Sequence, residues 1–349
     1  MTELPYAHGG PSLTGTLRAA PEDFRVDEDL GFVADGAGEH VFLLVEKRGA
    51  NTDFVARELA RYAGIGPEAV SYAGLKDRHA VTRQTFSLHL PGKRAEPDWQ
   101  ALQHAEFRVL QAARHSRKLK RGALRGNRFR IVLRDVAGDR AATDACLAAI
   151  AVEGVPNYFG EQRFGRGGAN VERALAMFAG RRVQRHERGL LLSAARSHLF
   201  NAVLAARIEA GNWRTPLPGE VWMLAGTHSI FGPEPLDAEL ARRFGAGDIG
   251  LTGPLWGKGA LRSADEVVRI EAGVVAQHAQ IAAGLEANGL NQERRALALH
   301  PAEFSADWST DRDLELAFAL PAGAYATAVL REICAWTTPP AGASAAPAE

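Results

Sequence analysis

The chain has 349 residues, of which 46% are hydrophobic, and its 41 Lys and Arg residues balance 41 Asp and Glu residues. That length allows two domains with sizeable cores, whereas no run of eighteen apolar residues predicts a membrane-spanning helix and MTELPYAHGG lacks the pattern of a secretory signal. The two cysteines, Cys146 and Cys334, lie in helix-like patterns and cannot staple a chain of this size, which favours a cytoplasmic protein.

The first 154 residues predict strands with two helices between them. Alternating or apolar runs indicate strands at HVFLLVE (40–46), AVSYAG (69–74), VTRQTFSLHL (81–90), FRVLQAARHS (107–116) and NRFRIVLRDV (127–136). Apolar residues at helical spacing predict helices at TDFVARELARYAG (52–64) and DRAATDACLAAIAVEG (139–154). GLKDRHA (74–80) then forms a turn between two strands.

The composition of the chain changes at Pro156. NYFGEQRFGRGGAN (157–170) predicts a loop or a domain boundary, and SAARSHLFNAVLAARIEAG (193–211) predicts a long helix. Residues 212–300 mix Pro- and Gly-rich turns with short helices. DLELAFALPAG (313–323) and AYATAVLREICAW (324–336) predict a strand and a last helix, and the low-complexity tail, 337–349, is expected to be disordered.

Positive charge is concentrated in the middle of the chain. Residues 101–200 carry 19 Lys and Arg against 8 Asp and Glu, and the remaining residues carry the opposite excess. The basic segment, RKLKRGALRGNRFR at 117–130, has seven basic and no acidic residues. Such a cluster steers a polyanion toward one face of a protein. The alternative is a solvated basic face without a partner.

Several sequence motifs resemble cofactor-binding sites but lack a part that such a site requires. GAGDIG (245–250) has the glycine spacing of a dinucleotide-binding turn, but it follows a helical pattern instead of a strand. GPLWGKG (253–259) has no Ser or Thr after its Lys, so it is no phosphate-binding loop. The eleven histidines show no spacing typical of metal ligands. We therefore expect no metal and no cofactor.

One short stretch has the features of a reactive site. In GLKDRHAVTRQ (74–84), Asp77 lies between Lys76 and Arg78 in a tight turn between two predicted strands. Two neighbouring cations favour the ionised carboxylate and would lower its pKa. A carboxylate held on a short loop over a sheet can act as a nucleophile or as a base. A surface cluster of ion pairs is the alternative.

Six stretches in order resemble the tRNA pseudouridine synthase D (TruD) family over almost the whole chain. They are PEDFRVDE (21–28), GLKDRHAVTRQ (74–84), GNRFR (126–130), VPNYFGEQRFG (155–165), SAARSHLFN (193–201) and LPAGAYATAVLRE (320–332). The resemblance implies an α+β fold with a pseudouridine synthase core, a mixed and mainly antiparallel sheet flanked by helices. It places this core at 1–153 and 301–336 and an inserted α/β domain at 154–300.

The resemblance also implies a reaction and its residues. Uridine, implied to be uridine 13 of tRNA, would be flipped out and isomerised to pseudouridine with Asp77 as the catalytic carboxylate, by a glycal or an acylal route. Phe129 would stack on the target base, and Asn127 would bind it by its amide. Phe24 and Tyr325 would line the pocket, although the family commonly has Phe at the position of Tyr325. Core positions are the alternative for Phe24 and Phe129.

Two groups of basic residues would contact RNA phosphates. The first group lies before Phe129: Arg117, Lys118, Lys120, Arg121 and Arg125. The second lies at the start of the inserted domain: Arg163, Arg166, Arg181, Arg182 and Arg185. Such contacts give affinity but little sequence information. The protein is thus expected to be a cytoplasmic, monomeric enzyme acting on tRNA. A non-catalytic RNA-binding module and a structural protein that associates through its oppositely charged halves are the alternatives.

Overall fold

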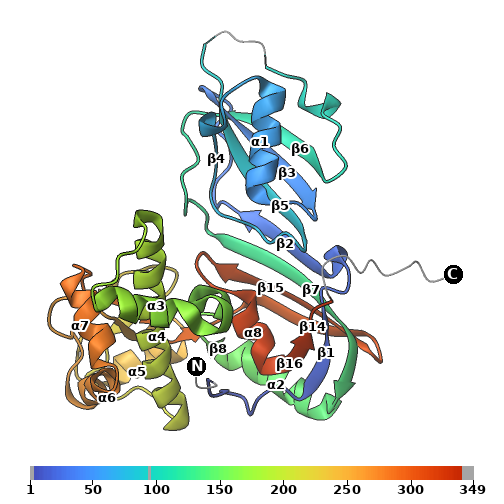
Figure 1. Ribbon diagram of the computed structural model, residues 1–349. Helices are drawn as coiled ribbons and strands as arrows, with labels where there is room; N and C mark the ends of the chain where they lie inside the picture. Colours follow the sequence, from blue (N-terminus) through green and yellow to red (C-terminus); the bar gives the residue numbers. More distant parts are fainter. Residues whose placement is uncertain (1–3, 93–95, 340–349) are drawn as a thin grey trace. The chain divides into compact units, whose positions relative to one another are not determined.

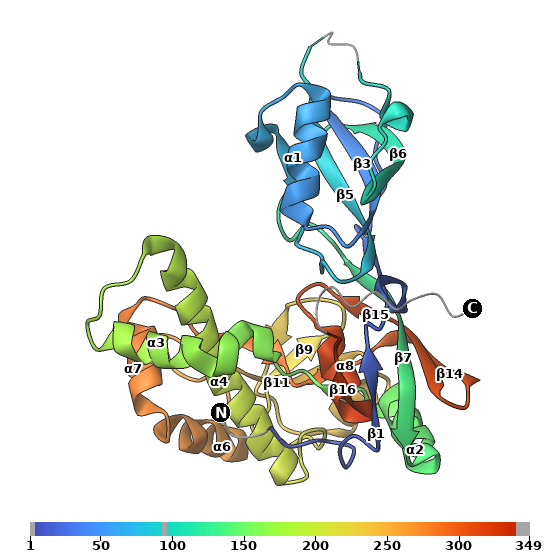
Figure 2. The same cartoon turned by 45° about the vertical axis from the view of Figure 1, so that its right-hand side comes forward.

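A computed structural model describes residues 4–92 and 96–339, which form two compact units (Figures 1 and 2). The sheet unit comprises Pro11–Leu147, Pro301–Gly323 and the chain from Cys334. The helical unit comprises the chain up to Gly10, Ala148–His300 and Ala324–Ile333. The predicted α+β class is confirmed. The predicted boundaries of an inserted domain, 154 and 300, stay a prediction.

The described part of the sheet unit contains one ten-stranded mixed sheet. Its main path runs β14-β15-β7-β2-β5-β3-β6, while β1 pairs with β7 and β16, and β4 pairs with β5. The β1–β16 and β2–β5 pairs are parallel and the others are antiparallel. The strands are β1 (Leu13–Leu17), β2 (Phe24–Asp29), β3 (His40–Arg48), β4 (Val70–Tyr72), β5 (Val81–His89), β6 (Phe107–His115), β7 (Gly126–Gly138), β14 (Ala302–Thr310), β15 (Asp313–Pro321) and β16 (Cys334–Thr337).

One helix covers the part of the sheet built by β3, β4 and β5. In β3, Val41, Leu43 and Val45 alternate inward and are fully buried. The matching stripe on α1 (Thr52–Ala63), which includes Val55 and Leu59, packs against them (Figure 1). Alternation at period two and at helical spacing thus explains why the sequence predicted both elements.

The long strand β7 joins the two ends of this sheet. It pairs with β2 and β15 along its first half and with β1 along its second. At its start a Cβ on Gly126 would lie 2.2 Å from the backbone oxygen of Leu320 in β15. Only glycine allows this close approach, which fixes the register of the GNRFR motif.

The helical unit surrounds two small sheets. One sheet has the order β10-β9-β11-β12, and the other pairs β13 with β8. The strands are β8 (Val155–Pro156), β9 (Trp222–Leu224), β10 (Ile230–Phe231), β11 (Ile249–Leu255), β12 (Glu293–Ala296) and β13 (Ala298–Leu299). The helices are α3 (Ala169–Phe178), α4 (Arg185–Glu209), α5 (Ala238–Gly245), α6 (Asp265–Ala276), α7 (Ala279–Ala287) and α8 (Ala326–Ile333), while α2 (Arg140–Glu153) has residues in both units.

Helix α4 runs through the core of the helical unit. It begins at Arg185, eight residues before the predicted start at 193, because Gly189 does not interrupt it. Its length and composition would suffice to cross a membrane, although it contains no uninterrupted apolar run that would have indicated this. Half of its most apolar stretch is buried, and Leu199, Phe200 and Leu204 belong to the core, so it also fits a core helix of a soluble protein.

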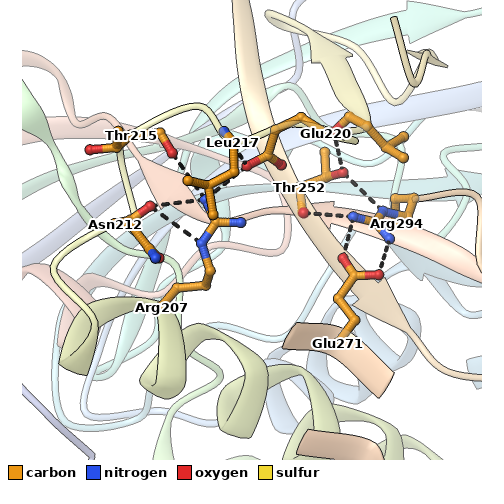
Figure 3. A network of polar contacts seen from close by, with 9 residues as sticks. Arg207, Asn212, Thr215, Leu217, Glu220, Thr252, Glu271 and Arg294 are labelled. Carbon is orange, nitrogen blue, oxygen red and sulfur yellow. Dashed lines mark hydrogen bonds and ion pairs between the residues drawn. The ribbon is translucent and has the colours of Figure 1, made fainter. Parts of the chain in front are cut away.

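In two ion pairs of the described helical unit, both side chains are almost completely buried (Figure 3). Arg207 donates to Glu220 at 2.8 Å, and Arg294 forms a bidentate pair with Glu271 at 2.7 and 3.0 Å. Arg294 also donates to the backbone and side-chain oxygens of Thr252. Burial raises the pKa of Glu220, and Arg207 partly offsets this. Removing one partner of such a pair would leave a buried, uncompensated charge.

The last predicted helix ends earlier than expected. Residues 324–336 were predicted to be helical, but α8 stops at Ile333 and Cys334–Thr337 form β16, which pairs in parallel with β1. Backbone pairing with a strand more than 300 residues away overrides the helical pattern there. Strands β1, β2 and β14 were not predicted. The predicted disordered tail begins on the last residue of β16 and lies outside the described residues from position 340.

Candidate active site and nucleic-acid interface

The Asp77 loop, residues 73–80, connects β4 to β5 in the sheet unit. The prediction that Lys76 and Arg78 provide the cationic surroundings of Asp77 is wrong in its geometry. Lys76 pairs with the buried Glu28 at 2.7 Å, and Arg78 donates to the backbone oxygen of Gly49 at 3.1 Å. Neighbours in a tight turn point in different directions, so adjacency in sequence did not produce an ion pair.

The cation beside Asp77 is Arg18, which follows β1. Its guanidinium donates to Oδ2 of Asp77, and Oδ1 accepts the backbone N–H of His79 at 3.3 Å. Arg18 has a φ of 60°, which is unusual for a residue other than glycine and costs about 1 kcal/mol or more. Its guanidinium also stacks over the ring of Phe24, 4.1 Å from the centroid. These contacts hold a cation against the carboxylate, and no local sequence pattern predicts them.

Hydrogen bonds with side chains outside the loop anchor the backbone of the Asp77 loop. The Lys47 ammonium on β3 is only 1% exposed and donates to the backbone oxygens of Asp77 and Ala50, each at 2.8 Å. Burial lowers the pKa of Lys47 to about 8, although Asp77 favours its charged form. At the other side of the loop, Thr52 Oγ1 accepts the backbone N–H of Lys76 at 3.0 Å. The carboxylate therefore sits on a loop with a fixed path.

Phe24 and Phe129 lie on neighbouring strands, with their ring centroids 6.3 Å apart in an edge-to-face arrangement. Phe24 is 3% exposed, so little of its ring is open to a ligand, and it supports Arg18. Phe129 is half-buried and lines a pocket of about 300 Å³ together with Phe318, four arginines and three carboxylates. Of these two aromatics, Phe129 is the one with an accessible surface.

Asn127 follows Gly126 at the start of β7. Its side-chain oxygen Oδ1 is buried and has no hydrogen-bond partner among the described residues. A buried acceptor without a donor costs about 1–3 kcal/mol. The amide oxygen therefore keeps an unused capacity to accept a hydrogen bond, but its surface is not open to solvent.

Tyr325 lies in the helical unit, just before α8. Its hydroxyl accepts a hydrogen bond from Arg163 at 2.8 Å, and Arg163 also donates to Ser193 Oγ at 2.9 Å. These contacts bring together the last three of the six family-like stretches. The sequence suggested that Arg163 binds RNA phosphates. In the structure its side chain is half-buried and held by these two hydrogen bonds.

A second guanidinium lies close to this cluster. Arg295 stacks on Phe159, 4.2 Å from the ring centroid, and donates to Asn157. Burial lowers the pKa of Arg295 to about 10, with Arg163 acting in the same direction. No carboxylate of the described residues pairs with either arginine. Arg295 was not predicted, because no motif surrounds it in the sequence.

The basic segment forms the loop between β6 and β7 and the start of β7. All five predicted phosphate-binding residues before Phe129 are exposed. Arg125 pairs with Asp29 at 2.7 Å, and Arg121 lies over the ring of Tyr72. The other three have no carboxylate partner in the described chain: Arg117, Lys118 and Lys120. In the helical unit Arg181, Arg182 and Arg185 are exposed, and the side chain of Arg166 lies outside the description.

The site is therefore a carboxylate and a cation beside aromatic and amide groups. Across residues 4–92 and 96–339, no group of three or more His, Cys, Asp or Glu side chains is arranged to hold a metal ion. The contacts join Asp77 to Arg18, Arg18 to Phe24, and Phe24 to Phe129, whereas Asp77 does not line the pocket beside Phe129. The chemistry that the carboxylate itself offers is nucleophilic or basic catalysis.

Comparisons with known proteins agree with one another. The family model of tRNA pseudouridine synthase D (TruD) matches residues 3–173 and 168–333. The tRNA pseudouridine synthase D of Xanthomonas campestris pv. campestris (strain 8004) is 53% identical over 345 residues, and that of Methylococcus capsulatus is 50% identical over 333 residues. Each match covers 95% of this chain and 94% of the relative.

The fold has a counterpart among solved structures. A crystal structure of a candidate tRNA pseudouridine synthase D from Methanosarcina mazei matches with a TM-score of 0.72 and 24% sequence identity. The match covers 94% of this chain and 95% of the other. At this identity the likeness concerns the fold alone, and it confirms the predicted fold.

Proposed function

The chain belongs to the tRNA pseudouridine synthase D family and is an isomerase, and we propose that it converts uridine 13 of tRNA to pseudouridine with Asp77 as the catalytic carboxylate. In this reaction the bond between C1′ of the ribose and N1 of uracil breaks, and a bond between C1′ and C5 forms. C5 loses a proton and N1 gains one, so the product is an isomer and no co-reactant is consumed.

The observation that carries the proposal is the Asp77 carboxylate held against Arg18 on an anchored loop. A hydrogen bond from a guanidinium to a carboxylate is charge-assisted and fixes where the carboxylate points. A carboxylate in a fixed orientation serves both for attack on C1′ and for removal of a ribose proton. Arg18 acts in this proposal as a positioning residue, because it reaches the chemistry only through Asp77.

Base extrusion is the second part of the proposal. A uridine in a stacked RNA cannot reach a carboxylate on the protein surface, so it must leave its stack at a cost of a few kcal/mol. The accessible ring of Phe129 would offset about 1–3 kcal/mol by stacking, and the unpaired amide oxygen of Asn127 would accept a hydrogen bond from the uracil. The predicted contact of Tyr325 with the target base stays a prediction.

Charge and environment complete the proposal. The exposed cations Arg117, Lys118 and Lys120 would bind RNA phosphates, with Arg121 and Arg125 near them. We further propose that the enzyme works as a cytoplasmic monomer that needs neither a membrane nor a cofactor. The burial of α4 in the core supports independence from a membrane.

The test uses unmodified tRNA and two matched variants. Asp77→Asn keeps the shape of the side chain and removes its charge, and Asp311→Asn makes the same change at a fully exposed position. Pseudouridine is mapped by carbodiimide treatment and primer extension. Wild type and Asp311→Asn should modify position 13, whereas Asp77→Asn should bind tRNA without turnover. Comparable turnover by Asp77→Asn would refute the role of Asp77, and modification at another position would refute the target.

A further inference from the structure

A second pocket lies in the sheet unit, and it combines three of the proposed phosphate-binding cations with aromatic residues to which the proposed function gives no role. Its volume is about 710 Å³, more than twice that of the pocket beside Phe129. Ligand pockets in proteins commonly span roughly 300–1,000 Å³. Its lining comes from the loop after β2, from β3, from the end of β6 with Ser116, and from the basic segment.

Aromatic rings form one wall of this pocket. Phe32 and His115 are stacked with their centroids 5.6 Å apart, and the ring of Phe42 contacts both, 4.5 Å from His115 and 6.4 Å from Phe32. Phe42 is buried, but Phe32 is 44% exposed. A phenylalanine fixed by stacking and still open to solvent presents a flat apolar face. Such a face is what a nucleobase stacks on.

Three cations also line the pocket. Arg117, Lys118 and Lys120 line the pocket, and none of them has a carboxylate partner in the described chain. The one acidic residue in the lining, Asp35, accepts the backbone N–H of Ser116 at 3.0 Å and so ties the β2–β3 loop to the residue just before the basic segment. The carboxylate of Asp35 thus connects two segments of the pocket, whereas the three cations form no ion pair within the described chain.

The pocket is attached to the first residue of the Asp77 loop, Ala73. Leu119 is buried in a small cluster with Phe42 and Ala73. The backbone N–H of Gly122 also donates to the backbone oxygen of Ala73 at 2.8 Å. A group bound in the pocket would therefore be held on the same scaffold as Asp77, four residues after Ala73.

From these contacts we infer that the pocket binds an unpaired nucleotide of the RNA substrate, different from the target uridine. Its base would stack on Phe32, and its flanking phosphates would lie on Lys118 and Lys120. The combination of an exposed ring with unpaired cations selects a nucleotide, because a purely apolar ligand would gain nothing from the cations and a simple anion would gain nothing from the ring. The inference rests on the proposed function for the identity of the RNA.

The first experiment measures binding of a tRNA transcript and of a short single-stranded RNA by fluorescence anisotropy. Phe32→Leu keeps an apolar side chain but removes the ring, and Phe32→Trp keeps a stacking surface. Val33→Ala is the control, since this neighbouring side chain is 87% exposed and lies outside the pocket. Removal of the stacking ring should raise the dissociation constant of Phe32→Leu roughly 5- to 150-fold, whereas Phe32→Trp and Val33→Ala should bind like wild type.

The second experiment locates the nucleotide. A transcript with 4-thiouridine is photo-crosslinked to the wild-type protein, and the tryptic peptides are identified by mass spectrometry. Cross-links should appear on the peptide Val26–Lys47, which carries Phe32. Replacing Lys118 and Lys120 by Ala should lower the slope of log affinity against log salt by about 0.7 for each single-strand phosphate that the protein no longer neutralises.

The outcomes separate this inference from the proposed function. If wild type forms pseudouridine but Phe32→Leu binds RNA as tightly as Val33→Ala, the pocket is not a nucleotide site and the inference is overturned. If wild type forms no pseudouridine while the Phe32 variants and the cross-links behave as described, the proposed function fails and the nucleotide site stands.

Discussion

Replacing Lys47 by Met should change how the stability of the protein depends on pH. The ammonium is buried and its pKa falls from 10.5 to about 8. The unfolded chain therefore binds the proton more tightly than the folded chain. Wild-type stability should rise as pH increases from about 8 to 10.5, because the cost of burying the charge disappears over that range.

The size of this effect follows from the two pKa values. A difference between 10.5 and about 8 corresponds to about 3 kcal/mol of folding free energy at pH 7. By pH 10 most of the unfolded chains still carry the proton, and about 2.5 kcal/mol of that cost has been recovered. A neutral amine retains two N–H donors, so both carbonyl contacts of Lys47 survive deprotonation.

The assay is urea unfolding of wild type and Lys47→Met at pH 7 and pH 10. Other groups titrate in both proteins and cancel in the difference, so the advantage of wild type over the variant should grow by about 2–3 kcal/mol between the two pH values. Lys120→Met, at an exposed position, should show no such growth. A constant difference between wild type and Lys47→Met would show that Lys47 titrates normally, which would refute the effect of burial on its pKa.

Three further results are expected. Glu271→Gln should destabilise the protein by about 3–5 kcal/mol in urea unfolding, since Arg294 would keep a buried charge without its partner. Phe129→Ala should lower single-turnover rates about tenfold to a hundredfold while tRNA affinity, measured in parallel, changes little; the reverse pattern would contradict base stacking. Tyr325→Phe removes the acceptor of Arg163 and should cost about 1 kcal/mol of unfolding free energy, and an unchanged unfolding curve would show that this hydrogen bond is replaced by water.

Helices and strands whose buried apolar residues recur at a regular spacing could be predicted from the sequence. Strand β3 and helix α1 have clear periods, and their observed bounds, His40–Arg48 and Thr52–Ala63, lie close to the predicted ones. Strand β14 (Ala302–Thr310) alternates without burying a large apolar face, so hydrophobicity did not reveal it. Strand β16 exists because β1 offers a free edge for pairing, and that information lies at the other end of the chain.

The residues of the candidate site also differ in whether the local sequence reveals them. Asp77 and Phe129 lie in motifs that can be read locally, and the structure gives both an accessible setting. Arg18 could not be found from its neighbours, because its position depends on a left-handed backbone and on a contact with a residue 59 positions later. Arg125 shows the opposite case, since a residue predicted to face phosphate is partly neutralised by Asp29.

The two oxygens of Asp77 are held unequally, and this difference bears on how a substrate would approach. Oδ2 is bound by the guanidinium of Arg18, which is itself fixed by the stack on Phe24. Oδ1 accepts only the backbone N–H of His79 among the described residues, at 3.3 Å, which is long for a hydrogen bond. A carboxylate that uses one oxygen for positioning keeps the other for chemistry, so Oδ1 is the atom expected to meet the ribose. In the proposed reaction, the contacts of Arg18 would fix the orientation of the carboxylate before RNA binds and so would leave less reorganisation for the chemical step.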